Sequence, residues 1–80
     1  PELIEPRPSE CRITLSNKNH PGMIGKITTV LADNKLNIID MVNKSRGDIA
    51  YNVIDLETKP PKKVLGELSA LDDVISVREV

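Results

Sequence analysis

The chain has 80 residues, a formal net charge of −1 and one aromatic residue, Tyr51. A chain of this length forms one domain, whose hydrophobic core is only just large enough to stabilise it. Because aromatic residues are almost absent, that core must consist of Ile, Val and Leu. Charges of both signs are dispersed, which argues against binding to a nucleic acid or to an anionic membrane surface. No apolar run approaches the roughly 20 residues that span a bilayer, and no signal-peptide pattern is seen, so we expect a cytoplasmic protein.

Residues 1–10 differ in composition from the rest of the chain. They include Pro1, Pro6 and Pro8 and show no periodicity, which is typical of a stiff linker. We expect them to connect an upstream domain to the domain of residues 11–80. Because the chain begins with proline rather than methionine, we also expect a fragment or a processed product. Cys11, the single cysteine, excludes an intrachain disulfide and a thiol metal cluster, and we expect it to be a core residue.

Periodicity predicts a strand, a helix and a second strand in the first half of the domain. Apolar and polar residues alternate over residues 11–16, which predicts a strand. A helix is predicted from near Gly22 to near residues 34–35, because apolar residues fall there at helical spacing, namely Ile24, Ile27, Val30 and Leu31. Residues 37–44 are apolar with polar interruptions, and we expect a second strand there.

The second half repeats this arrangement. Arg46, Gly47 and Asp48 predict a hairpin turn in which the glycine has a positive φ, and residues 49–57 form the third strand. After Pro60 and Pro61, the latter near the first turn, a short amphipathic helix carries Val64, Leu65, Leu68 and Leu71. Asp72 and Asp73 form a turn before a last strand at residues 74–80.

The predicted order is strand, helix, strand, strand, helix, strand. Right-handed crossovers place the third strand beside the first. The antiparallel sheet then runs in the order 4-1-3-2, with the second and fourth strands at its edges. Both helices cover one face and leave the other face open. The sequence therefore predicts an α+β fold, a ferredoxin-like βαββαβ sandwich.

The junction between the first strand and the first helix is the candidate site. Residues 17–25 combine amide side chains, a Pro-Gly turn and a second glycine where a helix begins. Helix N-termini offer unpaired N–H groups and a positive dipole end, which suit a carboxylate. The Asn19 amide can donate to a carboxylate and accept from an ammonium, and Gly22 and Gly25 allow close approach of the backbone. The alternative is an ordinary tight turn with an asparagine that caps the helix.

Reactive groups are sparse. His20 is the only histidine, and we expect a solvated or ligand-edge residue rather than a general base. Asp40 and Asp55 are expected on neighbouring strands, where they are solvated. No metal-ligand spacing exists. The basic run of Lys59, Lys62 and Lys63 predicts an exposed solubilising patch, with a phosphate site as the less favoured alternative.

Other proteins with this topology fit poorly. RNA-recognition domains stack bases on sheet aromatics, which this chain lacks. Metal-carrying domains need a CxxC loop after the first strand, and acylphosphatases need a glycine-rich anion loop with a nearby arginine. The loop of residues 17–25 has neither, so neither activity is expected.

Three segments resemble an ACT domain. They are Asn19-His20-Pro21-Gly22-Met23-Ile24-Gly25, then Leu36-Asn37-Ile38, then Ala50-Tyr51-Asn52-Val53-Ile54-Asp55-Leu56. More narrowly, they are similar to the C-terminal ACT domain of D-3-phosphoglycerate dehydrogenase, an NAD-dependent oxidoreductase of serine biosynthesis. The resemblance covers residues 12–80.

This resemblance implies an allosteric regulatory domain that senses L-serine or a similar small amino acid. The ligand-binding residues would be Asn17, Asn19, His20, Pro21, Gly22, Met23, Ile24, Gly25 and Asn37. Asn37 would come from the second subunit of a homodimer paired along its second strands. The chain itself would have no catalytic residue and no cofactor, and NAD would belong to the parent enzyme. The alternative is an ACT-type assembly module that binds no ligand.

Two residues depart from this pattern. Asn17 stands where serine-inhibited members often carry a histidine that contacts the serine hydroxyl. Asn52 shares strand parity with Ile54 and Leu56, where a strand that faces helices requires an apolar residue.

Overall fold

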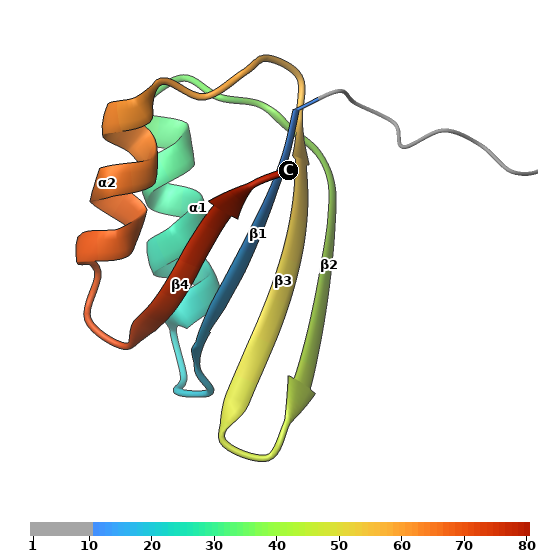
Figure 1. The fold of residues 1–80 in the computed structure, drawn as a ribbon, viewed down its shortest axis with the longest axis vertical. Helices are drawn as coiled ribbons and strands as arrows, with labels where there is room; N and C mark the ends of the chain where they lie inside the picture. Colours follow the sequence, from blue (N-terminus) through green and yellow to red (C-terminus); the bar gives the residue numbers. More distant parts are fainter. Residues whose placement is uncertain (1–10) are drawn as a thin grey trace, which may run out of the picture.

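The computed structural model describes residues 11–80, and the predicted linker of residues 1–10 lies outside them. Four strands and two helices alternate in the predicted order (Figure 1). The strands are β1 (Cys11–Lys18), β2 (Ile38–Arg46), β3 (Ile49–Leu56) and β4 (Val74–Glu79). The helices are α1 (Met23–Asp33) and α2 (Lys62–Ala70).

The sheet is antiparallel throughout and runs in the order β2-β3-β1-β4. Both helices lie on one face, with the other face open (Figure 1). The predicted ferredoxin-like sandwich is therefore confirmed. The first strand is longer than predicted, since Asn17 and Lys18 continue the ladder opposite Ala50 and Ile49 of β3.

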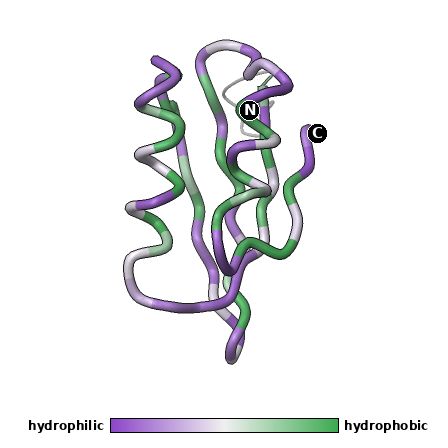
Figure 2. Tube along the Cα trace, turned by 90° about the vertical axis from the view of Figure 1, so that its left-hand side faces the viewer, coloured by the Kyte–Doolittle hydropathy of each residue, from purple (hydrophilic) through white to green (hydrophobic). Residues whose placement is uncertain are grey.

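The core is aliphatic, as the composition requires. The β1 and β3 side chains that face the helices are almost fully buried, as are those on the inner stripes of both helices, and the set comprises Ile13, Leu15, Ile27, Leu31, Ile54, Leu56, Val64 and Leu68. Hydrophobic and hydrophilic residues alternate along both helices (Figure 2). Cys11 is partly buried and packs against this cluster. No helix within residues 11–80 has the length and apolar character required to cross a membrane.

The open face of the sheet carries an ion pair between β1 and β3. Arg12 and Asp55 lie opposite each other in the ladder. The guanidinium donates from Nε to Oδ1 at 2.8 Å and from Nη2 to Oδ2 at 3.0 Å. These hydrogen bonds raise the pKa of Arg12. Asp55 is only 1% exposed, so the expectation that it is solvated is wrong; the partner arginine became evident only with the strand register.

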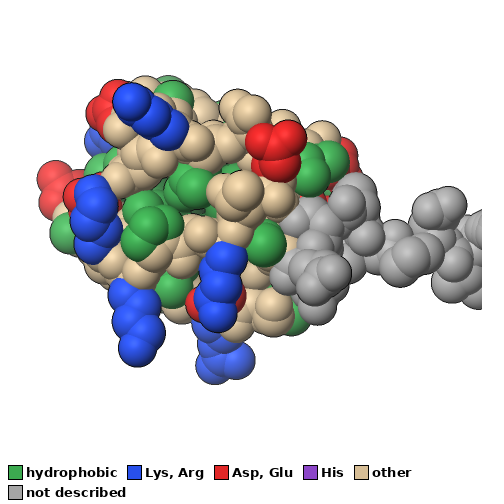
Figure 3. Space-filling view, turned by 90° about the horizontal axis from the view of Figure 1, so that it is seen from above, with side chains coloured by type: hydrophobic (Ala, Val, Ile, Leu, Met, Phe, Trp, Pro, Cys, Tyr) green, Lys and Arg blue, Asp and Glu red, His purple; other side chains and the backbone are tan. Residues whose placement is uncertain are grey.

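The basic run lies at the end of the sandwich where β3 connects to α2. Figure 3 views this end, where Lys and Arg side chains, together with Asp and Glu side chains, lie around a hydrophobic centre. Lys59, Lys62 and Lys63 are exposed, as predicted. Lys63 Nζ donates to Asn34 Oδ1 at 2.7 Å and lies 3.6 Å from Glu67 Oε2. This lysine therefore links the two helices.

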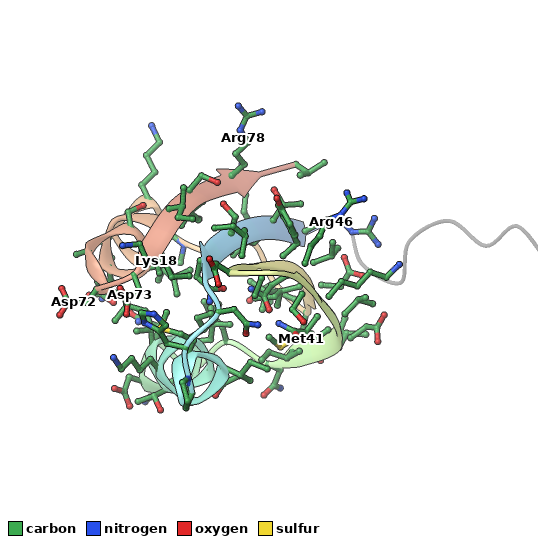
Figure 4. All side chains as sticks on the ribbon, turned by 90° about the horizontal axis from the view of Figure 1, so that it is seen from below. Lys18, Met41, Arg46, Asp72, Asp73 and Arg78 are labelled. Atoms are coloured by element: carbon green, nitrogen blue, oxygen red, sulfur yellow. The ribbon has the colours of Figure 1, made fainter. Side chains whose placement is uncertain are left out.

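The opposite end holds the β1–α1 loop in place. The backbone N–H of Lys18 donates to the Asp73 carbonyl, and that of Asn19 donates to the Asp48 carbonyl, each at 2.7 Å. His20 Nδ1 lies 2.8 Å from Asp73 Oδ2. Figure 4 shows this end from below, with Lys18 and Asp73 next to each other. The loop is thus attached both to the β2–β3 hairpin and to the turn before β4.

The contact between Asp73 and His20 should stabilise the fold in a way that depends on pH. Its hydrogen bond with His20 lowers its pKa from the ordinary value of 3.8, helped by the charges of His20, Lys18 and Lys26. A lowered pKa in the folded state stabilises the fold above the ordinary pKa, and this stabilisation is lost as the pH falls through the lowered value. We expect Asp73→Asn to lower the melting temperature at neutral pH. Asparagine also tolerates the positive φ of 74° at this position.

The measurement is the difference in melting temperature between the wild-type chain and Asp73→Asn, followed from about pH 6 to about pH 2.5. The difference should shrink towards zero at the acid end. Asp72→Asn, at the neighbouring exposed carboxylate, is the matched control. An Asp73→Asn difference that stays constant over this range would contradict the role assigned to the contact.

Candidate functional site

The β1–α1 loop forms one wall of a pocket of about 230 Å³. Eight of the nine residues predicted from the sequence line it together, namely Asn17, Asn19, His20, Pro21, Gly22, Met23, Ile24 and Gly25. Asn43 of β2 and Ala50 of β3 complete the lining. These two residues were missed, because only the strand register shows that the β2–β3 hairpin reaches this end of the sheet.

The start of α1 presents its backbone to the pocket. Gly22 precedes the helix with a φ of 86°, and none of the described side chains caps it. The asparagine cap of the alternative interpretation is therefore wrong, whereas the tight turn at Pro21 and Gly22 is present. The Met23 N–H donates to the His20 carbonyl at 3.4 Å. The next two N–H groups, those of Ile24 and Gly25, lie in the first turn of the helix, where backbone N–H groups have no carbonyl partner within the helix. A helix start of this kind favours an anionic group.

The two glycines leave space for such a group. A Cβ atom built on Gly22 or on Gly25 would meet no atom within 4 Å. The backbone at both positions therefore faces open space, as expected for a ligand that approaches the main chain closely. At Gly22 a larger residue would also be strained by the positive φ.

A row of three asparagines crosses the sheet behind the loop. Asn43 Nδ2 donates to Asn52 Oδ1 at 2.6 Å, and Asn52 Nδ2 donates to Asn17 Oδ1 at 2.8 Å. Asn52 Nδ2 also lies 3.3 Å from the Leu15 carbonyl, and Asn17 Nδ2 donates to the Lys18 carbonyl at 2.7 Å. We call Asn43, Asn52 and Asn17 the amide relay. It explains Asn52: this polar residue is buried among apolar ones because its carboxamide is fully paired.

Asn19 and His20 form the exposed rim of the pocket. The Asn19 side chain makes a long hydrogen bond to the Gly47 carbonyl, at 3.3 Å. This contact uses one N–H of the Asn19 amide. The His20 ring is turned to Asp73, as described above, and this contact attaches the loop to the turn before β4.

Asn37 is not part of this pocket. It precedes β2 at the other end of the sheet, where its Nδ2 donates to Glu57 Oε1 at 3.1 Å. The length of β3 separates the two ends by roughly 20 Å. Within one copy of the chain, Asn37 therefore lies too far away to line this pocket.

The pocket has the groups of a binding site rather than of a reaction centre. Within residues 11–80 no group of three His, Cys, Asp or Glu side chains is placed to hold a metal ion. The histidine ring pairs with a carboxylate and not with a hydroxyl or thiol nucleophile. What the pocket offers is amides and backbone N–H groups, which suit a small zwitterion.

Comparison with solved structures supports the fold. The chain is similar to the ACT domain of a GTP pyrophosphokinase from Chlorobium tepidum, with a TM-score of 0.75 at 19% identity over 88% of this chain and 95% of that one. It is similar to the regulatory subunit of aspartate kinase from Thermus thermophilus, with a TM-score of 0.66 at 15% identity over 85% of this chain and 49% of that one. It also resembles part of a homoserine dehydrogenase from Thiobacillus denitrificans, with a TM-score of 0.66 at 27% identity over 88% of this chain and 16% of that one.

The comparison with curated proteins gave no match. A family model described as the ACT domain matches residues 12–73, most of the chain. ACT domains are regulatory domains that bind small amino acids, often dimerise and are not catalytic on their own. The match over residues 12–73, on a βαββαβ fold with a pocket at the start of its first helix, shows that this chain belongs to the ACT domain family.

Proposed function

We propose that this domain senses L-serine and regulates an NAD-dependent D-3-phosphoglycerate dehydrogenase whose catalytic domains lie outside this chain. The observation that carries the proposal is the meeting of an uncapped helix start with three asparagine side chains, Asn17, Asn19 and Asn43, in one pocket of about 230 Å³. A carboxylate, an ammonium and a hydroxyl each find a partner of the right kind there. The resemblance of the loop and of the second and third strands supports the choice of parent enzyme.

The ligand would be held by its two charged ends. Its carboxylate would accept from the N–H groups of Ile24 and Gly25, where the helix dipole favours negative charge. Its ammonium would donate to an amide oxygen, for which Asn19, on the exposed rim of the pocket, is one candidate. The serine hydroxyl would meet Asn17, whose amide replaces the histidine of serine-inhibited relatives.

The second strand would supply the dimer interface. β2 is an edge strand, and its Ile39 and Val42 are 47% and 43% exposed. An apolar edge with unpaired backbone groups is a template for pairing with another chain. Antiparallel pairing of two β2 strands brings the start of one beside the end of the other. Asn37 of the second copy would then lie at the pocket end of the sheet, as the resemblance implies.

An assembly module that binds no ligand is the alternative, and the exposed β2 edge favours it as much as it favours the sensor. The two functions differ in the response to an amino acid. L-serine at about 100 times its dissociation constant should stabilise the folded chain by about 2.7 kcal/mol. For a domain of this size the melting temperature should then rise by roughly 10–20 °C. A melting temperature unchanged by L-serine, glycine and L-alanine would favour the assembly module.

Substitutions separate the binding residues from the scaffold. Asn19→Ala removes a hydrogen bond to a charged group, which is worth about 1.5–3 kcal/mol. Affinity measured by calorimetric titration with L-serine should therefore fall roughly tenfold to a hundredfold. Asn37→Ala should weaken binding similarly, whereas Gly22→Val should abolish it. His20→Ala should have the smallest effect in the loop, because its contact is with Asp73.

Asn34→Ala is the matched control for these titrations. It removes an asparagine amide at the end of α1 farthest from the pocket, where Asn34 Nδ2 donates to the Val30 carbonyl. Its affinity for L-serine should equal that of the wild-type chain. If His20→Ala abolishes binding while Asn19→Ala leaves it unchanged, the assignment of the loop is wrong.

The interface predicts how two charged variants behave in sedimentation. The wild-type chain should be a dimer, or a higher assembly, at tens of micromolar protein. Val42→Lys places a charge on the β2 edge and should give a monomer. Ile75→Lys places the same charge on β4, the other edge strand, at a side chain that is 54% exposed, and should leave the dimer intact. Loss of the dimer in Ile75→Lys alone would assign the interface to β4 instead.

A further inference from the structure

The amide relay connects the edge strand β2 to the ligand pocket through the interior of the sheet. Asn43 and Asn52 are directly opposite in the β2–β3 ladder, and Asn52 faces Leu15 in the β1–β3 ladder. Asn52, the middle member of the relay, is 1% exposed, and Asn17 is 2% exposed. Asn43 and Asn17 both line the pocket, whereas Asn52 does not. The buried middle of the relay thus stands between two residues that can touch a ligand.

Three hydrogen bonds fix the orientation of the Asn52 side chain. A carboxamide offers two N–H donors and one accepting oxygen. Both donors of Asn52 are directed to β1, one at Asn17 Oδ1 and one at the Leu15 carbonyl, and its oxygen accepts from Asn43. Rotation of this amide would break all three contacts inside the protein, where unpaired polar groups are costly. The Asn52 amide is therefore held in one orientation.

This orientation determines which hydrogen-bonding groups the two outer amides, Asn43 and Asn17, keep for other partners. Asn43 uses its Nδ2 on Asn52, so its Oδ1 is turned away from the relay. Asn17 uses its Oδ1 on Asn52 and one N–H on the Lys18 carbonyl, so one N–H remains. Each of these two amides thus keeps one N–H, and Asn43 also keeps its oxygen free of the relay. An inverted Asn52 would instead take up the Asn43 oxygen.

We propose that Asn43 is a ligand-contacting residue, whose Oδ1 accepts a hydrogen bond from the ammonium of the bound amino acid, and that Asn52 is the positioning residue that orients it. This inference rests on the proposed function, because it assigns a further contact to the same pocket. It also places a ligand contact on the edge strand itself. Occupancy of the pocket then connects β2 to the start of α1 through the ligand.

The test combines three substitutions with titration by L-serine. Asn43→Ala removes the acceptor and should lower the affinity about tenfold to a hundredfold. Asn52→Asp keeps the size of the side chain and the acceptor for Asn43, but it sets a carboxylate oxygen against Asn17 Oδ1. It should lower the affinity at least as much. Asn34→Ala, at the end of α1 farthest from the pocket, is again the control and should bind as the wild-type chain does.

A measurement without ligand tests the relay separately. In the ligand-free wild-type chain, the side-chain NH₂ protons of Asn52 should exchange with solvent far more slowly than those of the exposed Asn37, as followed by NMR. In Asn52→Asp the NH₂ resonances of Asn17 should shift. The exchange measurement needs only the wild-type chain, so it tests the relay even if Asn52→Asp does not fold.

The outcomes separate this inference from the proposed function. If the wild-type chain binds L-serine and Asn43→Ala binds it equally well, the contact at Asn43 is refuted while the sensor function stands. If Asn52 exchanges as fast as Asn37, the positioning role is refuted whatever the titrations show. If L-serine, glycine and L-alanine all fail to bind the wild-type chain, the proposed function and the contact at Asn43 both fall. Slow exchange at Asn52 would then still support its role in orienting the outer amides.

Discussion

The buried carboxamide of Asn52 is the constraint on which the site depends. A polar group that is 1% exposed has to find its partners inside the protein, and Asn52 finds them on both neighbouring strands. This requirement holds β2, β3 and β1 in one register at the end of the sheet where α1 begins. An apolar side chain there would pack as well against the core but would leave the Asn17 oxygen without its partner. The buried Asn52 amide thus orients the polar groups of the pocket wall.

The fold was predictable from the sequence because its signals are local. Alternation and helical spacing depend only on neighbours along the chain, so the order of elements and the positive φ of Gly47, at 63°, followed directly. Chain connectivity then fixed the strand order. The loop of residues 17–25 was also predictable, because its glycines and amides lie within one short segment of the chain. They therefore line one pocket even if the exact start of the helix is not known.

Features that depend on register were not predictable. Asn43 and Asn52 meet because the hairpin pairs Arg46 with Ile49, which places Asn43 opposite Asn52 three residues further along. The Arg12–Asp55 pair likewise required the β1–β3 register. The sequence did contain one usable signal, a polar residue at Asn52 where parity required an apolar one. Such a misfit is a reason to look for a second buried amide among the residues opposite it.

The arrangement also suggests how a domain of this kind transmits binding. The pocket is bounded by a helix start, by a loop attached to the turn before β4, and by the edge strand β2. A ligand held by the first and the last of these would connect a helix to the strand edge that we propose as the dimer interface. Regulation then needs no catalytic group in the domain, only a difference in free energy between the liganded and the free arrangement of that edge.

The most direct test of the account is an NMR titration of the chain with L-serine that follows the backbone N–H of Ile24 and Gly25. The account predicts that these two resonances shift most, since their N–H groups would bind the carboxylate, and that the side-chain NH₂ resonances of Asn17 and Asn43 shift with them. Saturable shifts confined to another surface, or none at all, would contradict the claim that the uncapped start of α1 is a binding site for an amino acid.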